Sequence, residues 1–246
     1  MGVEAVAAVV RGIPNMKEHE GRRVVRHLQS TGARQVLEIG TAHGVSAAYM
    51  ASALPDDGRV TSVDAAAAAP SRFPSAEEVL TRAGVRDRVE LVLVEDSSYT
   101  WWLKEQVERR SDADGNVEPR YDFCYLDGAH NFTIDGLAVV LVEKLLRPGG
   151  WLLLDDLGWT YEGGSHGPGQ GPDDLHLSPS ERTAPHVRAV FDVIVRQHPA
   201  FTEFREEDGW WGWAHKDPTG RRRYEVRTVT PLRDRLLRAV RRGDAP

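Results

Sequence analysis

The chain has 246 residues, a formal net charge of −6 at pH 7, 41% hydrophobic residues and 28% charged residues. This length and composition fit one soluble α/β domain with short additions, and the negative charge argues against a general nucleic-acid binder. Neither a membrane-spanning helix nor a signal peptide is expected, and the single cysteine, Cys124, predicts a reducing, cytoplasmic location without disulfides.

The first elements are a helix, a buried strand and a glycine turn. The helix is predicted over 15–31, because Val24, Val25 and Leu28 fall on one face and Gly32 follows. Residues 35–39 form a short, mainly apolar run without alternation, which is typical of a parallel strand buried on both faces. Glycines in the next turn let the backbone approach a ligand, and the helix start beyond it favours an anion. The pattern predicts a cofactor pocket at the carboxyl end of this strand.

The spacing of the glycines narrows the choice of cofactor. A nicotinamide site needs Gly-x-Gly-x-x-Gly, but Ala42 stands at the position of close approach. A Walker phosphate loop is excluded because no Gly-Lys-Ser/Thr follows. Acidic-x-Gly-x-x-x-Gly, here Glu38 to Gly44, instead resembles motif I of the class I S-adenosylmethionine-dependent methyltransferases. The resemblance implies that the methionine half of the cofactor contacts Glu38, Gly40, Thr41, Ala42, Gly44 and Ser46.

Strands and helices alternate along the next hundred residues. Strands are predicted at 35–39, 59–63, 89–94, 121–126 and 151–154. Helices are predicted after the first strand up to Leu54, over 75–83, and after the third strand up to Arg110. One more helix is predicted before Pro148-Gly149-Gly150, and its apolar face consists of Ile134, Leu137, Ala138, Leu141, Val142 and Leu145. Residues 65–74 are expected to be a loop or frayed helix, and 111–120 an exposed insert. This alternation predicts an α/β fold with a Rossmann-like doubly wound sheet that has helices on both faces.

Acidic residues close every one of these strands. They are Glu38, Asp64, Asp96 (just past its strand), Asp127, and Asp155 with Asp156. The carboxyl ends of parallel strands share one edge of the sheet, where such folds bind their ligands. We therefore expect an electronegative crevice that suits a cationic cofactor, a metal ion or both.

The chain changes character after the fifth strand. Residues 158–179 are rich in glycine and proline and predict a lid loop. A helix beginning near Thr183 and two strands at 201–206 and 210–215, joined by Asp208-Gly209, follow. This ending is the one expected of the methyltransferase fold, whose last strand is antiparallel. The resemblance thus covers about residues 20–216 and is nearest to the small metal-dependent O-methyltransferases of the catechol and antibiotic-sugar kinds.

The resemblance assigns roles to the acids of the cofactor side. Asp64 would pair with the ribose hydroxyls, because a carboxylate accepts from both at once. Asp96 would accept from the adenine amino group, with Ser97 beside it. Each acid also has a structural alternative as a strand-end or helix-capping group.

The remaining acids are the predicted Mg²⁺ ligands. They are Asp127, Asp155 and Asp156, and Asp127 would also contact the cofactor. Adjacent side chains of a strand point to opposite faces, so Asp155 and Asp156 ligate together only if the strand has already ended. Asp127 and Asp155 are the preferred pair. His130, three residues past Asp127, is the candidate general base at neutral pH, with helix capping or packing on the cofactor as the alternative.

The sequence divides into three parts on this reading. An N-terminal helical segment (1–34) precedes the methyltransferase domain (35–216), and a basic tail (217–246) follows. Residues 219–246 hold nine arginines against Glu225, Asp234 and Asp244. We interpret the tail as a docked or dimerising helix in preference to an RNA contact.

The predicted activity is Mg²⁺-assisted methyl transfer from S-adenosylmethionine to a hydroxyl of a small molecule, with natural products as the favoured acceptors. A homodimer is the expectation from the family. Two alternatives stay open: a metal-independent methyltransferase acting on nitrogen, carboxylate or RNA, and a relative that binds the cofactor without transferring a methyl group.

Overall fold

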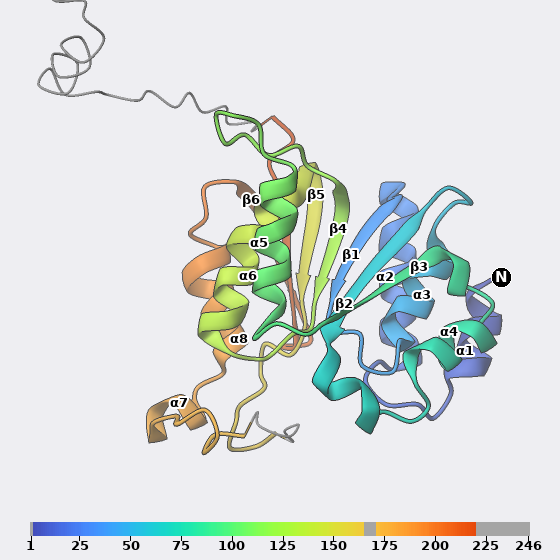
Figure 1. Cartoon of the computed structure of the whole chain (residues 1–246), viewed down its shortest axis with the longest axis horizontal. Coiled ribbons are helices and arrows are strands. Elements are labelled where there is room, and N and C mark those ends of the chain that lie inside the picture. The colour runs from blue at the N-terminus through green and yellow to red at the C-terminus, as the bar shows by residue number, and fades with distance from the viewer. Residues whose placement is uncertain (1, 165–170, 220–246) are drawn as a thin grey trace, which may run out of the picture.

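The computed structural model describes residues 2–164 and 171–219. Within them, seven strands form one sheet in the order β3-β2-β1-β4-β5-β7-β6 (Figure 1). The strands are β1 Gln35–Ile39, β2 Arg59–Ala65, β3 Val89–Val94, β4 Tyr121–Leu126, β5 Leu146–Leu154, β6 Phe201–Glu207 and β7 Trp211–Lys216. β1 to β5 are parallel, whereas β7 is antiparallel to both β5 and β6. The predicted doubly wound sheet with an antiparallel C-terminal hairpin is therefore confirmed.

Helices cover both faces of the sheet (Figure 1). On one face lie α1 Val3–Val10, α2 Glu18–Thr31, α3 Val45–Ala53 and α4 Ala76–Arg82; on the other lie α5 Tyr99–Arg109, α6 Phe132–Leu145, α8 His186–Ala189 and the π-helical turn η3 Val190–Val195. Two 3₁₀ turns, η1 Ala66–Ser71 and η2 Arg86–Arg88, and the short α7 Pro179–Thr183 complete the elements. Each face has its own apolar core, as expected when a sheet is buried on both sides.

The order of the strands reverses beside β1, which lies between β2 and β4. The backbone N–H of Asp127 donates to Ile39 O at 2.9 Å, and that of Asp155 donates to Leu126 O at 3.0 Å. These bonds join the carboxyl ends of β1, β4 and β5. The fold thus creates a topological switch point, the place at which open α/β sheets bind ligands.

The hairpin and the second helix form as the sequence indicates. α2 ends at Gly32, whose φ of +67° is the left-handed conformation that favours glycine at this position. Asp208 and Gly209, with φ of +55° and +72°, occupy the two left-handed positions of a tight hairpin turn between β6 and β7. The helix expected to begin near Thr183 is instead divided into α8 and η3, and the short α7 precedes it.

The fifth strand begins five residues earlier than predicted. Pro148-Gly149-Gly150, expected to end the preceding helix, lies inside β5. The pairing with β4 is irregular between Tyr121 and Phe123, and Gly149 has φ of +78°. A bulge of this kind lets a strand carry proline and glycine without losing its place in the sheet.

The inward face of α6 is rotated relative to the prediction. Asp135, Ala138, Val139, Val142 and Leu145 are buried, whereas Leu137 is half exposed. Asn131 caps the helix through Thr133 N (2.9 Å) and Ile134 N (3.2 Å). The apolar period could not identify this face, because one of its buried members is a carboxylate.

The N-terminal helices share a core with the sheet. Val6, Val10 and Val24 pack in the same cluster as α3 and Phe123 of β4. The division at residue 34 remains a prediction. No helix among the described residues is long and apolar enough to cross a membrane. The predicted helix of the basic tail lies in 220–246, outside the described residues.

Candidate functional site

The turn after β1 rests directly on the end of β4. A Cβ at Gly40, which has φ of +96°, would lie 1.8 Å from the carbonyl oxygen of Asp127. Only glycine fits this close approach. Gly44, with φ of +76°, precedes α3, and a Cβ there would meet Ala76 at 3.1 Å. Ala42 also has a left-handed backbone, φ +46°.

A cavity of about 200 Å³ opens beside this turn, and we call it the switch-point cavity. Its walls come from the ends of β1, β2 and β4 and from the loops that follow β4 and β5. The lining residues are Asn15, Gly40, Ala42, Asp64, Ala65, Arg72, Tyr99, Asp127, Gly128, Ala129, His130, Trp159 and Tyr161. Gly40, Ala42, Asp64, Asp127 and His130 are the predicted site residues that the fold brings together here.

Asp64 has protein partners on both of its carboxylate oxygens. Oδ1 accepts from Ala65 N at 2.7 Å, and Oδ2 accepts from Ala42 N at 2.8 Å and from the guanidinium of Arg72. Arg72 lies just after η1, and the sequence analysis did not single it out. Asp64 therefore lines the cavity, but both of its carboxylate oxygens already accept hydrogen bonds from other groups of the chain.

Three of the predicted cofactor residues lie behind the turn instead of in the cavity wall. Glu38 is fully buried and accepts from the hydroxyls of Ser46 and Ser62. Burial raises the pKa of Glu38 to about 8, although the two hydroxyl bonds lower it. Thr41 Oγ1 bonds to Ser62 Oγ at 2.6 Å. This buried network supports the turn from below, and direct cofactor contact by Glu38, Thr41 and Ser46 stays a prediction.

Asp96 and Ser97 lie in the loop between β3 and α5, and both are exposed. Neither lines the switch-point cavity. The adenine contact that the resemblance assigns to them stays a prediction.

Two acids and a histidine gather at the inner end of the cavity. His130 Nε2 lies 3.1 Å from Asp127 Oδ1 and 3.4 Å from Asp156 Oδ2. One ligand atom from each of these residues can be chosen so that all lie within 4.8 Å of one another. β5 has ended at Leu154, and Asp156 has a left-handed backbone, φ +60°. We call this group the Asp127–His130–Asp156 cluster.

Asp155, predicted as the safer ligand of the pair, points elsewhere. Its Oδ2 accepts from the hydroxyl of Tyr125, and its Oδ1 accepts from Asp156 N at 2.7 Å. Burial and the nearby charges of Asp127 and Asp156 raise the pKa of Asp155 to about 8. The preference for Asp155 over Asp156 is therefore not supported by the geometry.

The electrostatics of His130 differ from the expectation of titration near neutral pH. Burial alone would lower its pKa, but the hydrogen bond to Asp127 and the charges of Asp127 and Asp156 outweigh burial and raise the pKa to about 9. His130 thus carries a proton at pH 7 and is paired with carboxylates. Burial and Asp127 also raise the pKa of Asp156 to about 6.

A buried pair missed by the sequence analysis holds the loop that carries His130. The Tyr99 hydroxyl donates to Asp135 and accepts from Ala129 N at 3.0 Å, and Asp135 also accepts from Asn131 N at 2.9 Å. A Cβ at Gly128 would meet the Tyr99 hydroxyl at 2.4 Å. The loop after β4 is therefore fixed by two side chains from α5 and α6. A polar residue inside the apolar period of α6 was the available signal.

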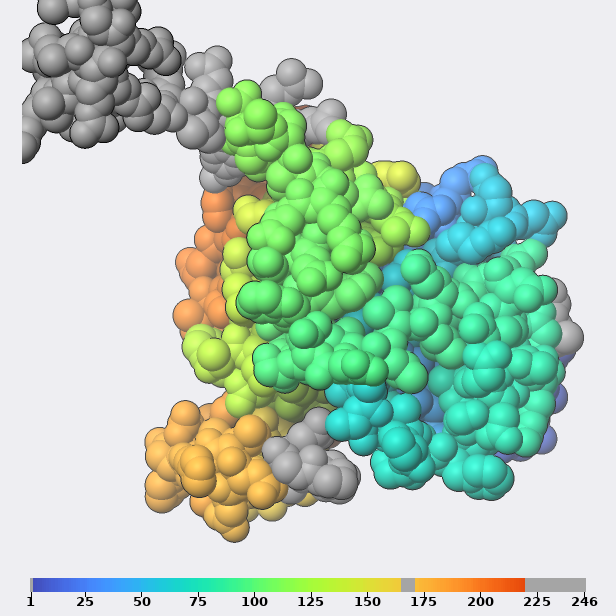
Figure 2. All heavy atoms as spheres, viewed as in Figure 1, coloured from blue at the N-terminus to red at the C-terminus, as the bar shows by residue number. Residues whose placement is uncertain are grey.

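Aromatic rings extend from His130 into the segment after β5. The ring centroids of Trp159 lie 4.8 Å from those of His130 and Tyr161, and Tyr161 lies 5.0 Å from His186. His186 Nδ1 in turn accepts from Phe132 N at 3.2 Å. The described beginning of the predicted lid is thus packed on the cavity. Figure 2 shows residues 171–185 and the segment after β2 as two protrusions at this end of the molecule.

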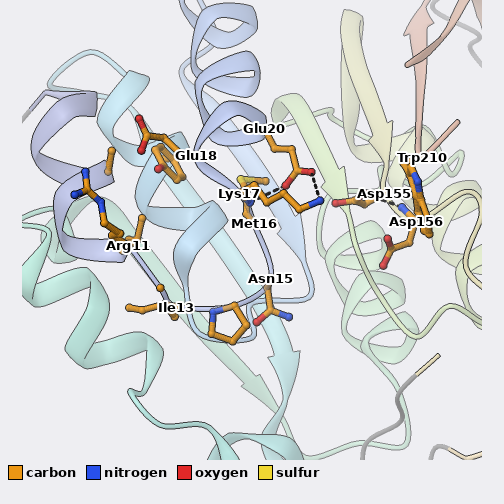
Figure 3. Close-up of a pocket in the computed structure, with 15 residues that line it drawn as sticks. Arg11, Ile13, Asn15, Met16, Lys17, Glu18, Glu20, Asp155, Asp156 and Trp210 are labelled. Carbon is orange, nitrogen blue, oxygen red and sulfur yellow. Dashed lines mark hydrogen bonds and ion pairs between the residues drawn. The ribbon is translucent and has the colours of Figure 1, made fainter. Parts of the chain in front are cut away.

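A second cavity, of about 610 Å³, lies on the other side of the acids, and we call it the N-terminal cavity. Residues 10–18 form most of one wall, and Tyr49, Asp155, Asp156 and Trp210 contribute the rest (Figure 3). In this view Arg11 and Trp210 lie at opposite ends, with Lys17 and Glu20 between them. Asn15 lines both cavities. Asp156 lines the N-terminal cavity, and its neighbours Asp127 and His130 line the switch-point cavity.

Comparison with known families agrees with the fold. Residues 37–157 match a methyltransferase domain family. A protein from Mycolicibacterium vanbaalenii, which carries a provisional O-methyltransferase name, is 30% identical over 129 residues, covering 50% of this chain and 47% of that protein. The chain thus spans about half the length of this curated relative.

Solved structures show the same architecture at low sequence identity. The O-methyltransferase from Bacillus cereus in complex with SAH has a TM-score of 0.59 at 21% identity, covering 87% of this chain and 88% of that one. TomG from Streptomyces achromogenes, an O-methyltransferase involved in tomaymycin synthesis and solved with SAM, has a TM-score of 0.57 at 20% identity, covering 87% and 89%.

Proposed function

We propose that this chain is a class I S-adenosylmethionine-dependent methyltransferase that transfers a methyl group to a hydroxyl of a small molecule with the help of a divalent cation. One observation carries the proposal. Asp127 and His130 line the switch-point cavity, Asp156 lines the larger cavity beneath the N-terminal segment, and the three side chains form one cluster between them. Donor and acceptor can therefore approach each other across a group of carboxylates.

The switch-point cavity is the proposed cofactor site. S-adenosylmethionine supplies a methyl group that its sulfonium already activates. Gly40 and Ala42 provide backbone that a ligand can approach, and Asp64 provides a carboxylate for the ribose. Asp127 adds negative charge near a cationic donor. Holding the two reactants in a reactive arrangement can itself lower the barrier by roughly 7–11 kcal/mol.

The donor set of the cluster fits a hard divalent cation. Asp127 and Asp156 offer carboxylate oxygens, which Mg²⁺ and Mn²⁺ prefer, and each is partly buried. Burial and the charge of Asp127 raise the pKa of Asp156, as expected when two carboxylates share a partly buried site. We assign Asp127 and Asp156 as the holders. His130 would act as a third donor, favouring Mn²⁺ over Mg²⁺, once the cation has displaced the proton from its ring. When bound, the cation lowers the pKa of the acceptor hydroxyl.

The N-terminal cavity is the proposed acceptor site. Its apolar wall includes Ile13 and Met16, aromatic surface comes from Tyr49 and Trp210, and Asp156 lies at its inner end. This mixed lining suits a compact hydroxylated molecule. A natural-product acceptor, a homodimer and a cytoplasmic location remain proposals that rest on the family resemblance and on the buried thiol of Cys124.

A metal-independent transfer is the second candidate. His130 Nε2 already lies within 3.4 Å of carboxylate oxygens of both Asp127 and Asp156. An imidazolium there would complete the cluster without an added ion. His130 would then position the acceptor hydroxyl instead of sharing a cation.

Calorimetry and chelation test the proposal. S-adenosylmethionine should bind, Asp64→Ala should weaken binding at least tenfold, and the exposed control Asp87→Asn should not. Binding of NADH in place of S-adenosylmethionine would contradict the cofactor assignment. Turnover on an accepted substrate should disappear with EDTA and return with Mg²⁺ or Mn²⁺, whereas a rate unaffected by chelation would select the metal-independent candidate.

A further inference from the structure

Asp64 has too few open acceptor positions to bind a ribose as it stands. A carboxylate offers about four lone-pair positions. Ala65 N occupies one position on Oδ1, while Ala42 N and the Arg72 guanidinium occupy both positions on Oδ2. One position is left, but two ribose hydroxyls need two. The backbone amides belong to the turns that form the cavity, so Arg72 is the group that can leave.

Arg72 is brought to Asp64 by the segment between β2 and α4. η1 connects Ala65 to Arg72, both of which line the cavity, and the far end of the segment is fastened where the His43 ring bonds to Pro74 O at 2.7 Å. Arg72 and Asp64 side chains are 24% and 11% exposed. The pair is thus partly shielded from water, where an ion pair is stronger than on an open surface.

We propose that Arg72 is an internal competitor of the cofactor for Asp64 and thereby sets the affinity of the site. In the free protein the guanidinium neutralises the carboxylate. Binding of the ribose breaks this ion pair and replaces it with bonds from two neutral hydroxyls. The cofactor therefore binds with less free energy than its own contacts supply. This inference rests on the proposed cofactor site.

The consequence is a substitution that improves binding. Without Arg72, the Asp64 carboxylate is unpaired in the free protein, and the ribose gains the full interaction. Loss of a partly exposed ion pair of this kind corresponds to about threefold to tenfold in affinity. The gain should require the charge of Asp64, because Arg72 acts only through it.

The test is calorimetry with S-adenosylhomocysteine as the probe, because its uncharged sulfur removes general repulsion between Arg72 and a sulfonium. Arg72→Gln should bind about threefold to tenfold more tightly than the unmodified chain. The matched control is Arg82→Gln, an exposed arginine of α4 that lines neither cavity, and its affinity should be unchanged.

A double-mutant cycle isolates the pair. Asp64→Asn should bind the probe weakly, and adding Arg72→Gln to it should give no gain. Equal or weaker binding by Arg72→Gln, or the same gain in the Asp64→Asn background, overturns the inference. If Arg72→Gln fails to fold, Arg72→Lys serves instead; its single ammonium pairs less well with Asp64, so an affinity above that of the unmodified chain supports the inference and a lower one overturns it. Absence of probe binding by the unmodified chain contradicts the proposed function itself.

Discussion

Buried and partly buried carboxylates are stabilised differently at the two ends of the site. On the side of β1 and β2, Glu38 and Asp64 are bonded to serine hydroxyls, backbone amides and Arg72. On the side of β4 and β5, burial and the mutual repulsion of the carboxylates raise the pKa values of Asp155 and Asp156, and the His130 ring pairs with Asp127 and Asp156. The first region balances its carboxylates with hydrogen bonds and an arginine, whereas the second keeps three carboxylates close to one histidine.

The largest expected effect comes from a substitution at the contact between the two regions. In Gly40→Ala, the new Cβ would lie 1.8 Å from the Asp127 carbonyl, so the β1 turn and the end of β4 must separate. We expect a loss of about 3 kcal/mol or more in the free energy of unfolding, measured by urea denaturation. Gly115→Ala, in open space with a similar φ, is the control for left-handed strain. Equal losses in the two variants would show that the close approach is unimportant.

A second histidine, His27, lies among aromatic rings, whereas His130 is paired with carboxylates. His27 of α2 packs against Phe123, Trp151 and Trp213, and burial lowers its pKa to about 4, with smaller contributions from nearby positive groups. Because the folded pKa lies below the unfolded value, the unfolded chain binds more protons between pH 6.5 and 4, and stability falls as the pH falls through that range. The loss should reach about 3 kcal/mol.

Urea unfolding at pH 7, 6, 5 and 4 measures this loss. In His27→Leu the ionisable ring is absent, so its stability should decline less over the same range. Parallel profiles for the two proteins would show that His27 does not titrate on unfolding.

Metal-binding measurements can distinguish which of the two acids after β5 is a ligand. Asp156→Asn should lower Mn²⁺ affinity at least tenfold, because its carboxylate belongs to the Asp127–His130–Asp156 cluster. Asp155→Asn should change it by less than about threefold, since that carboxylate bonds to Tyr125. Electron paramagnetic resonance of Mn²⁺ gives both affinities. The reverse order would restore Asp155 as the ligand.

The smallest effect concerns the support of the His130 loop. Tyr99→Phe removes the hydroxyl between Asp135 and Ala129 N and leaves a buried carboxylate with one partner fewer. We expect a loss of about 1–2 kcal/mol in stability and a weaker Mn²⁺ affinity. Tyr121→Phe is the matched control, because this buried tyrosine of β4 lines neither cavity. A Mn²⁺ affinity unchanged by Tyr99→Phe would show that the loop holds its shape alone.

The sequence predicted those parts of the molecule in which the backbone conformation or burial restricts the residue types. The bounds of β1, β3 and β4 and the glycine turn follow from short, mainly apolar runs and from a position where only glycine fits. Asp156 was ranked below Asp155 because the sequence does not show how the chain turns after a strand ends. Asp135 was missed because its partner Tyr99 lies 36 residues earlier, and Arg72 because the path of η1, which returns it to Asp64, leaves no pattern in the sequence.

The contact between Gly40 and the Asp127 carbonyl bears on how the proposed site could accept new acceptors. Since two stretches of main chain touch there without side chains between them, the scaffold fixes the spacing between the proposed cofactor turn and the proposed cation ligand Asp127. Adaptation must then act on the outer walls, the strap of residues 11–17 and the aromatic start of the segment after β5. Libraries aimed at altered selectivity should therefore vary those walls and leave the junction intact.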